Sequence, residues 1–558
     1  MHPSTLAKRG TVLLFLAIVV FYFCGLGHLP LVGPDEPRYA QVAREMFLRG
    51  DLVTPTLGGH TWFEKPALLY WMMIASFKLF GVTEWSARLP SAISGVLTVA
   101  AVFVVGRKVE VVEEGGDHKL QGYAFWSAIA AATTLGIVGF SHAASFDIVL
   151  TMTTTWALAF YVLYDLQEHS DVSEKPSGWL LSGFYIFVGL SLLAKGLVGI
   201  VMPIGVIGLY HIFQRRLPGR KTFISLFWGL PLALIVAGIW YGPVIWRHGW
   251  LFIDQFFIQH HFARYISNKY HHKQPVYFYL LVVPLLALPW TAFLIDGLLQ
   301  FKSRLWHADA AVGDRSAQNS NRLMTFAFAW FIFPLVFFSF SGSKLPGYIL
   351  PVLPAVALIV GGQLRGLRSD SGSWPLRTTA AIYLLFAIGA VAYSWRTGNL
   401  SLTTALLLAA PLFAAGCFPF LFTRKRATSV VLMAAMTVVA LVVVMYRVAP
   451  TFAKRESSRD LLQLADASGY AQTAIYGLQR SDRTPEFYAA GRVIYGADGE
   501  PIMYEGPDEV IEESRKRKEV LLTFVPMGEV RRLTEMSSAE TEVIGDNVRY
   551  AIVAVRAR

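Results

Sequence analysis

Two adjacent carboxylates, Asp35 and Glu36, follow the first long apolar stretch, in the segment LPLVGPDEPRYAQVAREM. Residues 11–33 form an uncharged apolar run, and about 20 such residues suffice to cross a bilayer. Arg38 and Tyr39 lie one helical turn after Asp35, on the same face if a helix begins near Pro37. A carboxylate beside a cation and a phenol at a membrane surface suits chemistry on a lipid-linked phosphate. The alternative is that the two acids only complement a helix N-terminus.

Further polar residues stand beside apolar stretches later in the chain. They are Trp62, Glu64 and Lys65 (GGHTWFEKPALLYW), Asp147 (SHAASFDIVL), Lys195 (LLAKGLVG), His260, His261, Arg264 and Tyr265 (FIQHHFARYI), and Lys344 and Tyr348 (SFSGSKLPGYILPVLP). Each has a structural alternative: Asp147 could cap a helix, Lys195 could snorkel from a tight turn, and the His pair could be solvated. The number of these residues favours a single site that binds an anionic ligand.

The chemistry of these residues suits phosphate. Arginine and lysine are the usual phosphate binders, and both act more strongly where water is excluded. Aromatic residues near the interface could stack on a sugar ring, or could simply form an interfacial belt. A transferase outside the cytoplasm has no ATP, so it needs a donor that is already activated and delivered by the membrane. A sugar on a polyprenyl phosphate meets that requirement.

The composition indicates a polytopic membrane protein. The 558 residues are 54% hydrophobic and 16% charged, against about 25% charged in an average soluble protein. The basic isoelectric point near 9.4 does not indicate nucleic-acid binding, because residues 451–558 hold 15 Lys and Arg against 18 Asp and Glu. The positive excess therefore belongs to short loops between apolar stretches. The two cysteines, Cys24 and Cys417, lie in apolar runs and exclude a disulfide framework.

The fold expected is an all-α polytopic membrane domain, residues 1–450, followed by a small soluble α/β domain, residues 451–558. About thirteen spans are expected, near 11–30, 88–106, 123–140, 146–164, 178–193, 196–213, 224–245, 276–298, 323–340, 347–363, 378–394, 401–422 and 429–447. Clusters such as Arg107–Lys108 and Arg215–Arg216 fall on alternate loops, which predicts a cytoplasmic location for that side. The first span is expected to be retained rather than cleaved as a signal peptide.

The candidate residues all fall on the opposite, outer side, together with the C-terminal domain. The outer loop 31–87 is expected to contain two interfacial helices, near 37–49 and 66–80, and the outer loop 246–275 holds five histidines. In the C-terminal domain, helices are expected near 457–468 and 508–519, and strands near 473–478, 492–496, 519–526 and 549–556.

The segments GPDEPRYAQVAREM, FEKPALLYW, LLAKGLVG, HHFARY and FSFSGSKLPGYILPVLP closely resemble the bacterial aminoarabinose transferases that modify lipid A. These are GT-C glycosyltransferases, which carry an acidic residue in the first outer loop. The resemblance covers about the first 360 residues. It implies a multi-pass enzyme of the bacterial inner membrane with a periplasmic active site. Such an enzyme moves 4-amino-4-deoxy-L-arabinose from undecaprenyl phosphate to a lipid A phosphate with inversion, which confers resistance to polymyxin and other cationic peptides.

The resemblance also assigns roles to residues. Asp35 is implied as the catalytic acidic residue, and Arg38, Lys65, Lys195, Arg264 and Lys344 as the phosphate-binding residues. The substrate cavity is expected to be lined by Glu36, Tyr39, Trp62, Glu64, Asp147, His261 and Tyr348. No cofactor is implied with certainty, although Glu64 with His260 or His261 could hold a divalent metal ion. The partners expected are the undecaprenyl-linked donor, lipid A and the bilayer, with a monomeric protein and no nucleic acid.

Other functions stay open on sequence alone. Another GT-C enzyme, such as a protein O-mannosyltransferase, would share most of these features. A lipid transporter or flippase would instead place charges at mid-bilayer in broken spans. A non-catalytic scaffold would have no use for the polar residues of the outer loops.

Overall fold

The computed structural model describes residues 3–110, 122–168, 177–263, 274–306, 315–367, 374–422, 425–479 and 483–558. The chain forms two compact units. The helical unit contains residues 1–24, 64–69 and 90–443. The loop–sheet unit contains residues 25–63, 70–89 and 444–558, so most of the first loop groups with the C-terminal residues.

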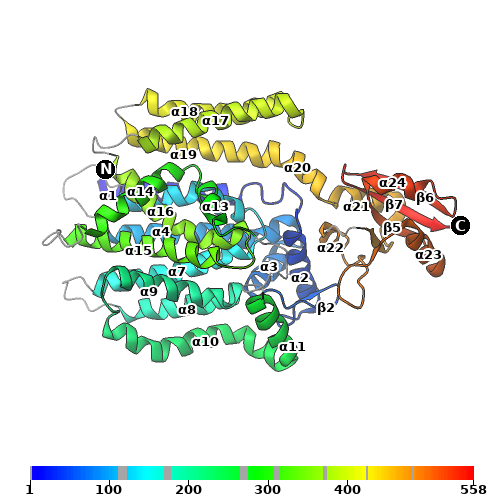
Figure 1. The fold of residues 1–558 in the computed structure, drawn as a ribbon, viewed down its shortest axis with the longest axis horizontal. Coiled ribbons are helices and arrows are strands. Elements are labelled where there is room, and N and C mark those ends of the chain that lie inside the picture. Colours follow the sequence, from blue (N-terminus) through cyan, green and yellow to red (C-terminus); the bar gives the residue numbers. More distant parts are fainter. Residues whose placement is uncertain are drawn as a thin grey trace. The chain divides into compact units, whose positions relative to one another are not determined.

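The helical unit is a bundle of apolar helices (Figure 1). Its elements are α1 (Pro3–Phe23), α4 (Glu84–Lys108, whose first six residues belong to the loop–sheet unit), α5 (Tyr123–Thr133), α6 (Leu135–Ser141), α7 (Phe146–Glu168), α8 (Gly178–Lys195), α9 (Val198–Phe213), α10 (Arg220–His248), α11 (Trp250–Phe252), the π-helix η2 (Ile253–Ala263), α13 (Phe278–Leu286), α14 (Thr291–Trp306), α15 (Arg315–Ser339), the 3₁₀-helix η4 (Pro346–Val352), α16 (Leu353–Gly366), α17 (Trp374–Thr397), α18 (Leu402–Leu421) and α19 (Arg426–Val443).

Each predicted span coincides with a helix or with a broken pair of helices. Among the described residues, nine helices are long and apolar enough to cross a membrane, or ten if the bent pair α5 and α6 counts as one. Those two helices meet at 57°. Three predicted spans fall outside this number: α1, which counts only with its part Val12–Phe23, the 16-residue α9, and the interrupted region of α13 and α14. The apolar runs therefore located the helices, and the proline and glycine breaks shortened some of them.

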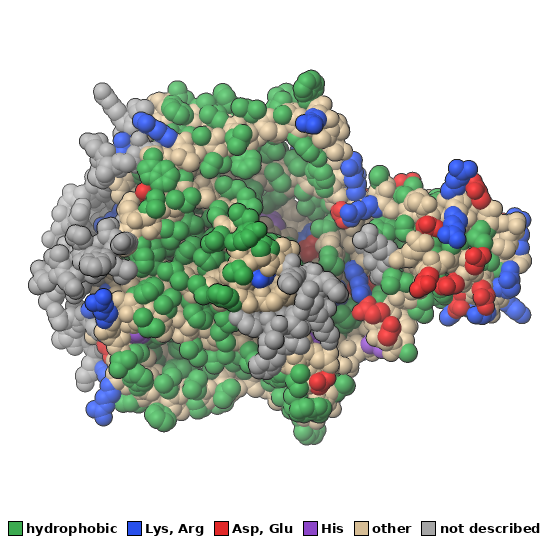
Figure 2. Space-filling view, viewed as in Figure 1, with side chains coloured by type: hydrophobic (Ala, Val, Ile, Leu, Met, Phe, Trp, Pro, Cys, Tyr) green, Lys and Arg blue, Asp and Glu red, His purple; other side chains and the backbone are tan. Residues whose placement is uncertain are grey.

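Hydrophobic side chains cover much of the outer surface of the helical unit (Figure 2). Phe227 and Trp246 of α10 are 86% and 90% exposed, and Trp395 of α17 is 90% exposed. Exposing apolar side chains of this size to water is unfavourable in free energy, whereas contact with lipid tails carries no such cost. The structure is thus that of a multi-pass membrane protein.

The first loop contains both of the predicted helices, as α2 (Asp35–Arg49) and α3 (Leu68–Phe80). A two-stranded hairpin, β1 (Thr56–Leu57) and β2 (His60–Thr61), lies between them. Glu45 of α2 anchors this hairpin: its carboxylate accepts hydrogen bonds from Thr56 Oγ1 at 2.6 Å, from the Gly58 amide at 2.8 Å and from the Gly59 amide at 3.3 Å. The sequence pattern predicts the two helices but does not predict this anchoring.

The C-terminal part is the predicted α/β domain, and charged side chains of both signs are interspersed on its surface (Figures 1 and 2). The chain reaches it through η5 (Val444–Val448) and α20 (Ala449–Glu456). Its five-stranded sheet has the order β4-β3-β5-β7-β6, with β4 (Met503–Tyr504), β3 (Ile475–Leu478), β5 (Leu521–Pro526), β7 (Tyr550–Ala557) and β6 (Ala539–Asp546). Strand β3 is parallel to β4 and β5, and the β5–β7 and β7–β6 pairs are antiparallel.

Helices cover both faces of this sheet. The helices α21 (Arg459–Ala465), with its extension η6 (Asp466–Tyr470), and α22 (Thr484–Tyr488) belong to one face, and α23 (Pro507–Arg517) and α24 (Met527–Thr534) to the other. Successive strand residues alternate between the two cores. Leu522 and Ile552 belong to the core under α21 and α22, and Leu521 and Val553 belong to the core under α23 and α24.

Two details of the sheet differ from the sequence prediction. The strand expected at 492–496 is wrong, because only isolated bridges from Val493 and Tyr495 occur there. Strands β4 and β6 were not predicted. Strand β6 pairs only with β7 and leaves several of its side chains exposed, so it lacks the apolar pattern that marks a central strand.

Candidate functional site

Asp35 is the first residue of α2, and its side chain is 53% exposed. Gly33 precedes it with φ of +68°, a conformation that favours glycine and turns the chain into the helix. Asp35 Oδ1 accepts a hydrogen bond from Arg38 Nη2 at 2.9 Å, one helical turn later. The guanidinium of Arg38 in turn lies 5.3 Å from the centroid of the Trp62 ring. The predicted pairing of Asp35 with Arg38 is therefore confirmed within the loop–sheet unit, and the aromatic ring at Arg38 is that of Trp62 rather than the expected phenol of Tyr39.

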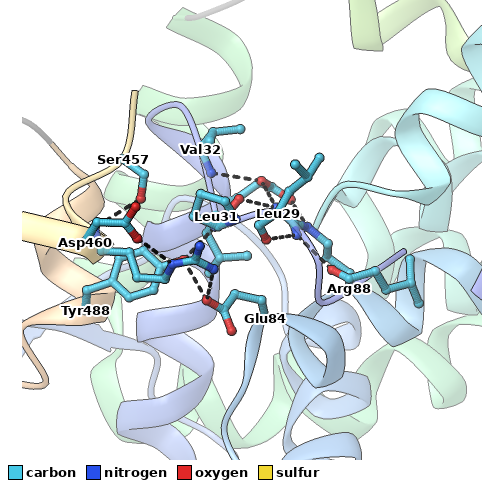
Figure 3. Close-up of polar contacts among 12 residues, drawn as sticks. Leu29, Leu31, Val32, Glu84, Arg88, Ser457, Asp460 and Tyr488 are labelled. Carbon is cyan, nitrogen blue, oxygen red and sulfur yellow. Dashed lines mark hydrogen bonds and ion pairs between the residues drawn. The ribbon is translucent and has the colours of Figure 1, made fainter. Parts of the chain in front are cut away.

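Glu36 is buried beside Asp35 and serves a different arrangement. Its two carboxylate oxygens accept from Arg88 Nε at 2.9 Å and Nη2 at 2.8 Å (Figure 3). Arg88 belongs to the first turns of α4, and its side chain is 3% exposed. The remaining donors of Arg88 bond the carbonyls of Leu26, Leu29 and Pro30 at 2.7 to 2.8 Å. This pair fixes the segment that leads to Asp35.

Sequence reasoning missed Arg88 because this residue stands at the start of an apolar span, where a cation is easily read as a flank of that span. The predicted cavity residue Tyr39 is also buried, at 6% exposure, within α2. The signal available in the sequence was Arg88 itself, a cation at the end of a span, together with Glu36 in the loop that precedes this span.

The helical unit contains a cavity of about 660 Å³, part of it open to solvent. Several predicted residues line it, although they come from segments far apart in the chain. The described lining residues are Glu64, Lys65, Pro66, Lys195, Val198, His260, Phe337, Phe338, Ser341, Ser343 and Tyr348. Two cations, one carboxylate, one imidazole and three hydroxyls thus share one wall with apolar side chains, as expected of a site that orients a polar group beside a hydrocarbon chain.

Lys195 ends α8 and is the centre of this arrangement. Its ammonium pairs with Asp147, in the first turn of α7, and lies 4.3 Å from the centroid of the Tyr348 ring. Gly347 allows Asp147 to approach, because a Cβ at that position would lie 2.1 Å from Asp147 Oδ2. The structure therefore brings Asp147, Lys195 and Tyr348 together, as the sequence analysis expected.

Lys65 and Glu64 form a second pair at 2.7 Å, with side chains 11% and 12% exposed. Lys344 is also buried, but its ammonium donates to the carbonyls of Ser341 at 2.7 Å and Gln274 at 3.0 Å. Burial lowers the pKa of Lys344 from its ordinary value. Lys344 therefore organises the turn after α15 that presents Ser341 and Ser343, two hydroxyls that the sequence analysis had not singled out.

The donor set does not by itself define a metal centre. Glu64 and His260 line the same cavity, but among the described residues no group of three or more His, Cys, Asp or Glu could hold a metal ion. Arg264 lies outside the described residues, and the side chain of His261 lies outside them as well.

Comparison with known proteins gives consistent matches. Residues 64–241 match the family model described as dolichyl-phosphate-mannose-protein mannosyltransferase. The arabinosyl transferase of Erwinia tasmaniensis that uses undecaprenyl phosphate-α-4-amino-4-deoxy-L-arabinose is 31% identical over 68% of this chain and 64% of its own length. The corresponding protein of Pseudomonas aeruginosa strain UCBPP-PA14 is 30% identical over 68% and 65%. The match thus spans just under two thirds of these curated relatives.

A solved structure covers nearly the whole chain. ArnT from Cupriavidus metallidurans bound to undecaprenyl phosphate is similar with a TM-score of 0.77 and 26% identity, over 98% of both chains. The fold and the site together define a multi-pass membrane protein with the fold of this ArnT. Its sequence is similar to those of the arabinosyl transferases, in agreement with the resemblance seen in its motifs.

Proposed function

We propose that this protein is an inverting glycosyltransferase that moves 4-amino-4-deoxy-L-arabinose from undecaprenyl phosphate to phosphate groups of lipid A. The observation that carries the proposal is the cavity in which Lys65 and Lys195, each held by a carboxylate, face Tyr348 and two serines. Such cations can neutralise the leaving phosphate of a lipid-linked sugar, and they need no reorganisation when charge develops.

Charge balance supports a site for an anion that arrives and leaves. Glu64 and Asp147 offset the charges of Lys65 and Lys195, so neither ammonium is an uncompensated buried charge before a phosphate binds. An incoming phosphate shares both lysines with these carboxylates and gains cations that are already oriented. Arg38 and, outside the described residues, Arg264 complete the proposed phosphate-binding set with Lys344.

Asp35 is proposed as the catalytic carboxylate of this reaction. The attacking group is an oxygen of the lipid A phosphate, which forms a bond to the anomeric carbon as the bond from that carbon to the undecaprenyl phosphate oxygen breaks. A phosphate monoester has a second pKa near 6 and is largely ionised at neutral pH. Asp35 therefore serves mainly to position the acceptor and to stabilise positive charge on the sugar. Glu36, Tyr39 and Trp62 belong to its surroundings in the proposal.

The proposed setting is the bacterial inner membrane, with about thirteen spans. Arg107, Lys108, Arg215 and Arg216 would then lie on the cytoplasmic side, and the cavity, Asp35 and the C-terminal domain on the periplasmic side. The protein is proposed to act as a monomer. Reporter fusions placed after residue 213 and at the C-terminus would test the orientation.

A divalent ion held by Glu64 and His260 or His261 remains a proposal. A carboxylate and an imidazole suit a transition-metal ion such as Mn²⁺ or Zn²⁺ better than Mg²⁺, and phosphate oxygens and water would have to complete the coordination. Loss of transfer by purified protein in a chelator, with recovery on adding Mg²⁺ or Mn²⁺, would support it.

Mass spectrometry of lipid A tests the proposed function directly. Cells that lack this modification would carry the wild-type protein, Asp35→Ala or Lys65→Ala, at matched expression. The wild-type protein is expected to add one aminoarabinose mass to lipid A, and both variants are expected to add little or none. Unmodified lipid A together with mannosylated proteins would instead favour the mannosyltransferase alternative, to which residues 64–241 are similar.

Replacing Gly347 by alanine is expected to lower transfer about tenfold or more while the protein still folds. The new methyl group needs the space of the Asp147 carboxylate and, to a lesser extent, of the Phe140 ring, so the carboxylate must move and release Lys195 from its orientation. Gly389→Ala in α17 is the matched control, because a Cβ there has nothing within 4 Å. Equal rates for both variants in detergent-purified protein would contradict this role of the Asp147–Lys195 pair.

A further inference from the structure

One hydroxyl group of the C-terminal domain bonds directly to the segment that precedes Asp35. Within the loop–sheet unit, Tyr488 Oη accepts a hydrogen bond from the Leu31 amide at 2.6 Å and donates one to Glu84 at 3.2 Å (Figure 3). Leu31 lies four residues before Asp35, and Glu84 is the first residue of α4. Tyr488 therefore joins the first loop, the start of α4 and the C-terminal domain.

Two partly buried contacts reinforce this junction. Arg459 of α21 pairs with Glu84 at 3.3 Å, and both side chains are at most 24% exposed. Arg44 of α2 donates to the carbonyl of Phe487 at 3.2 Å, next to Tyr488 in α22. These groups come from α2, α4, α21 and α22, so the junction consists of several contacts and does not depend on one side chain.

The C-terminal side of the junction is closely packed. The sheet core beneath α21 and α22 buries Leu461, Leu462, Ile475, Phe524 and Ile552 to 3% exposure or less. Close packing of this kind holds the two helices in one position against the sheet.

The loop side depends on its partners. Residues 26–34 form no regular helix or strand, apart from turns, and side chains hold several of their backbone groups. Arg88 bonds the carbonyls of Leu26, Leu29 and Pro30, Glu36 accepts from the Val32 amide, and Tyr488 accepts from the Leu31 amide. The direction in which α2 begins is therefore set by these bonds.

We infer that Tyr488 is a positioning residue for the reaction, through which the C-terminal domain fixes the start of α2 and the direction of the Asp35 carboxylate. The inference rests on the proposed function, because it assigns Tyr488 a role in a reaction that uses Asp35. The C-terminal domain then acts as the rigid support of the catalytic loop.

Kinetics of the full-length Tyr488→Phe variant test this role. Phenylalanine keeps the ring and its edge-to-face packing with Phe487, at 5.3 Å between centroids, and deletes only the hydroxyl. A small misplacement of a catalytic group can cost up to about 100-fold in rate. We expect kcat to fall about tenfold, with KM for the undecaprenyl-linked donor within about twofold of the wild-type value.

Tyr470→Phe is the matched control. Its hydroxyl donates to Glu542 at 2.7 Å within the C-terminal domain, so this variant also loses one tyrosine hydrogen bond. It is expected to keep the wild-type kcat. All proteins are compared as monodisperse fractions, so that a lower yield of folded protein does not enter the rate.

Hydrogen–deuterium exchange supplies a readout that does not need transfer activity. The Leu31 amide is expected to exchange at least tenfold faster in Tyr488→Phe than in the wild-type protein or in Tyr470→Phe. If the wild-type protein transfers aminoarabinose and Tyr488→Phe keeps its kcat, or raises only KM, the positioning role is wrong. If the wild-type protein transfers nothing, the proposed function fails, and the exchange result still decides whether Tyr488 orders the loop.

Discussion

The Arg88→Met variant is expected to lose about 3–5 kcal/mol of stability, since removing one partner of a buried ion pair leaves the other charge uncompensated. Arg88 is 3% exposed and bonds both carboxylate oxygens of Glu36 and three backbone carbonyls. Methionine preserves most of the side-chain volume but supplies no donors. Thermal unfolding in detergent, followed by the loss of the monodisperse peak, measures the effect.

Arg531→Met is the matched control, because Arg531 pairs with Glu535 across one turn of α24 and the two side chains are 86% and 63% exposed. A solvent-exposed pair contributes about 0–1 kcal/mol, so this variant is expected to unfold near the wild-type temperature. The double variant Glu36→Met with Arg88→Met removes both charges, and it is expected to be more stable than Arg88→Met alone. A double variant that is as unstable as the sum of both single variants would contradict a buried-charge origin.

The membrane part of the fold was predictable because its signal is strong. Apolar runs such as 224–245 and 378–394 can hardly be anything but membrane helices, and α10 and α17 follow them closely. The predicted span 276–298 shows the limit. Its composition is apolar throughout, but the chain breaks between α13 and α14, and a hydropathy pattern does not report such a break.

The site was predictable where a charged residue stands alone in apolar surroundings. Lys195 and Asp147 are conspicuous for this reason, and they pair in the structure. Residues whose role depends on a distant partner were not predictable in the same way. Nothing in the C-terminal sequence marks Tyr488 as a partner of Leu31, because 457 positions separate them and the contact depends on how the sheet packs.

Glu36 shows that the residue type, which the sequence gives, does not determine whether the side chain is buried in the structure. Asp35 and Glu36 are equivalent by sequence, but a helix turns successive side chains by about 100°, so one carboxylate is half-exposed and the other is buried against Arg88. The adjacent acids therefore have different surroundings: Glu36 holds the loop, whereas Asp35 pairs with Arg38 at the start of α2.

Replacing Asp35 by asparagine is expected to lower transfer by about 10²–10⁴-fold, the range typical for loss of a catalytic acid, base or charge-stabilising group. The amide oxygen can still accept the hydrogen bond from Arg38 that the carboxylate accepts at 2.9 Å, so the start of α2 is expected to persist. The loss then reports the missing negative charge. Asp51→Asn, in the same loop, is the control: the Asp51 carboxylate accepts from the Val53 amide at 2.9 Å, and an amide oxygen can replace it.

The pH dependence of this loss decides what Asp35 does. If Asp35 mainly stabilises positive charge on the sugar, the ratio of wild-type to Asp35→Asn rates stays constant between about pH 6 and 8.5, because asparagine lacks the charge at every pH. If Asp35 instead takes a proton from the acceptor phosphate, the ratio falls as the acceptor ionises above its second pKa near 6. We expect the constant ratio, since the acceptor is already nucleophilic at neutral pH. A variant that regains most of its activity by about pH 8.5 would assign proton transfer to Asp35 and show that an ionised acceptor no longer needs it.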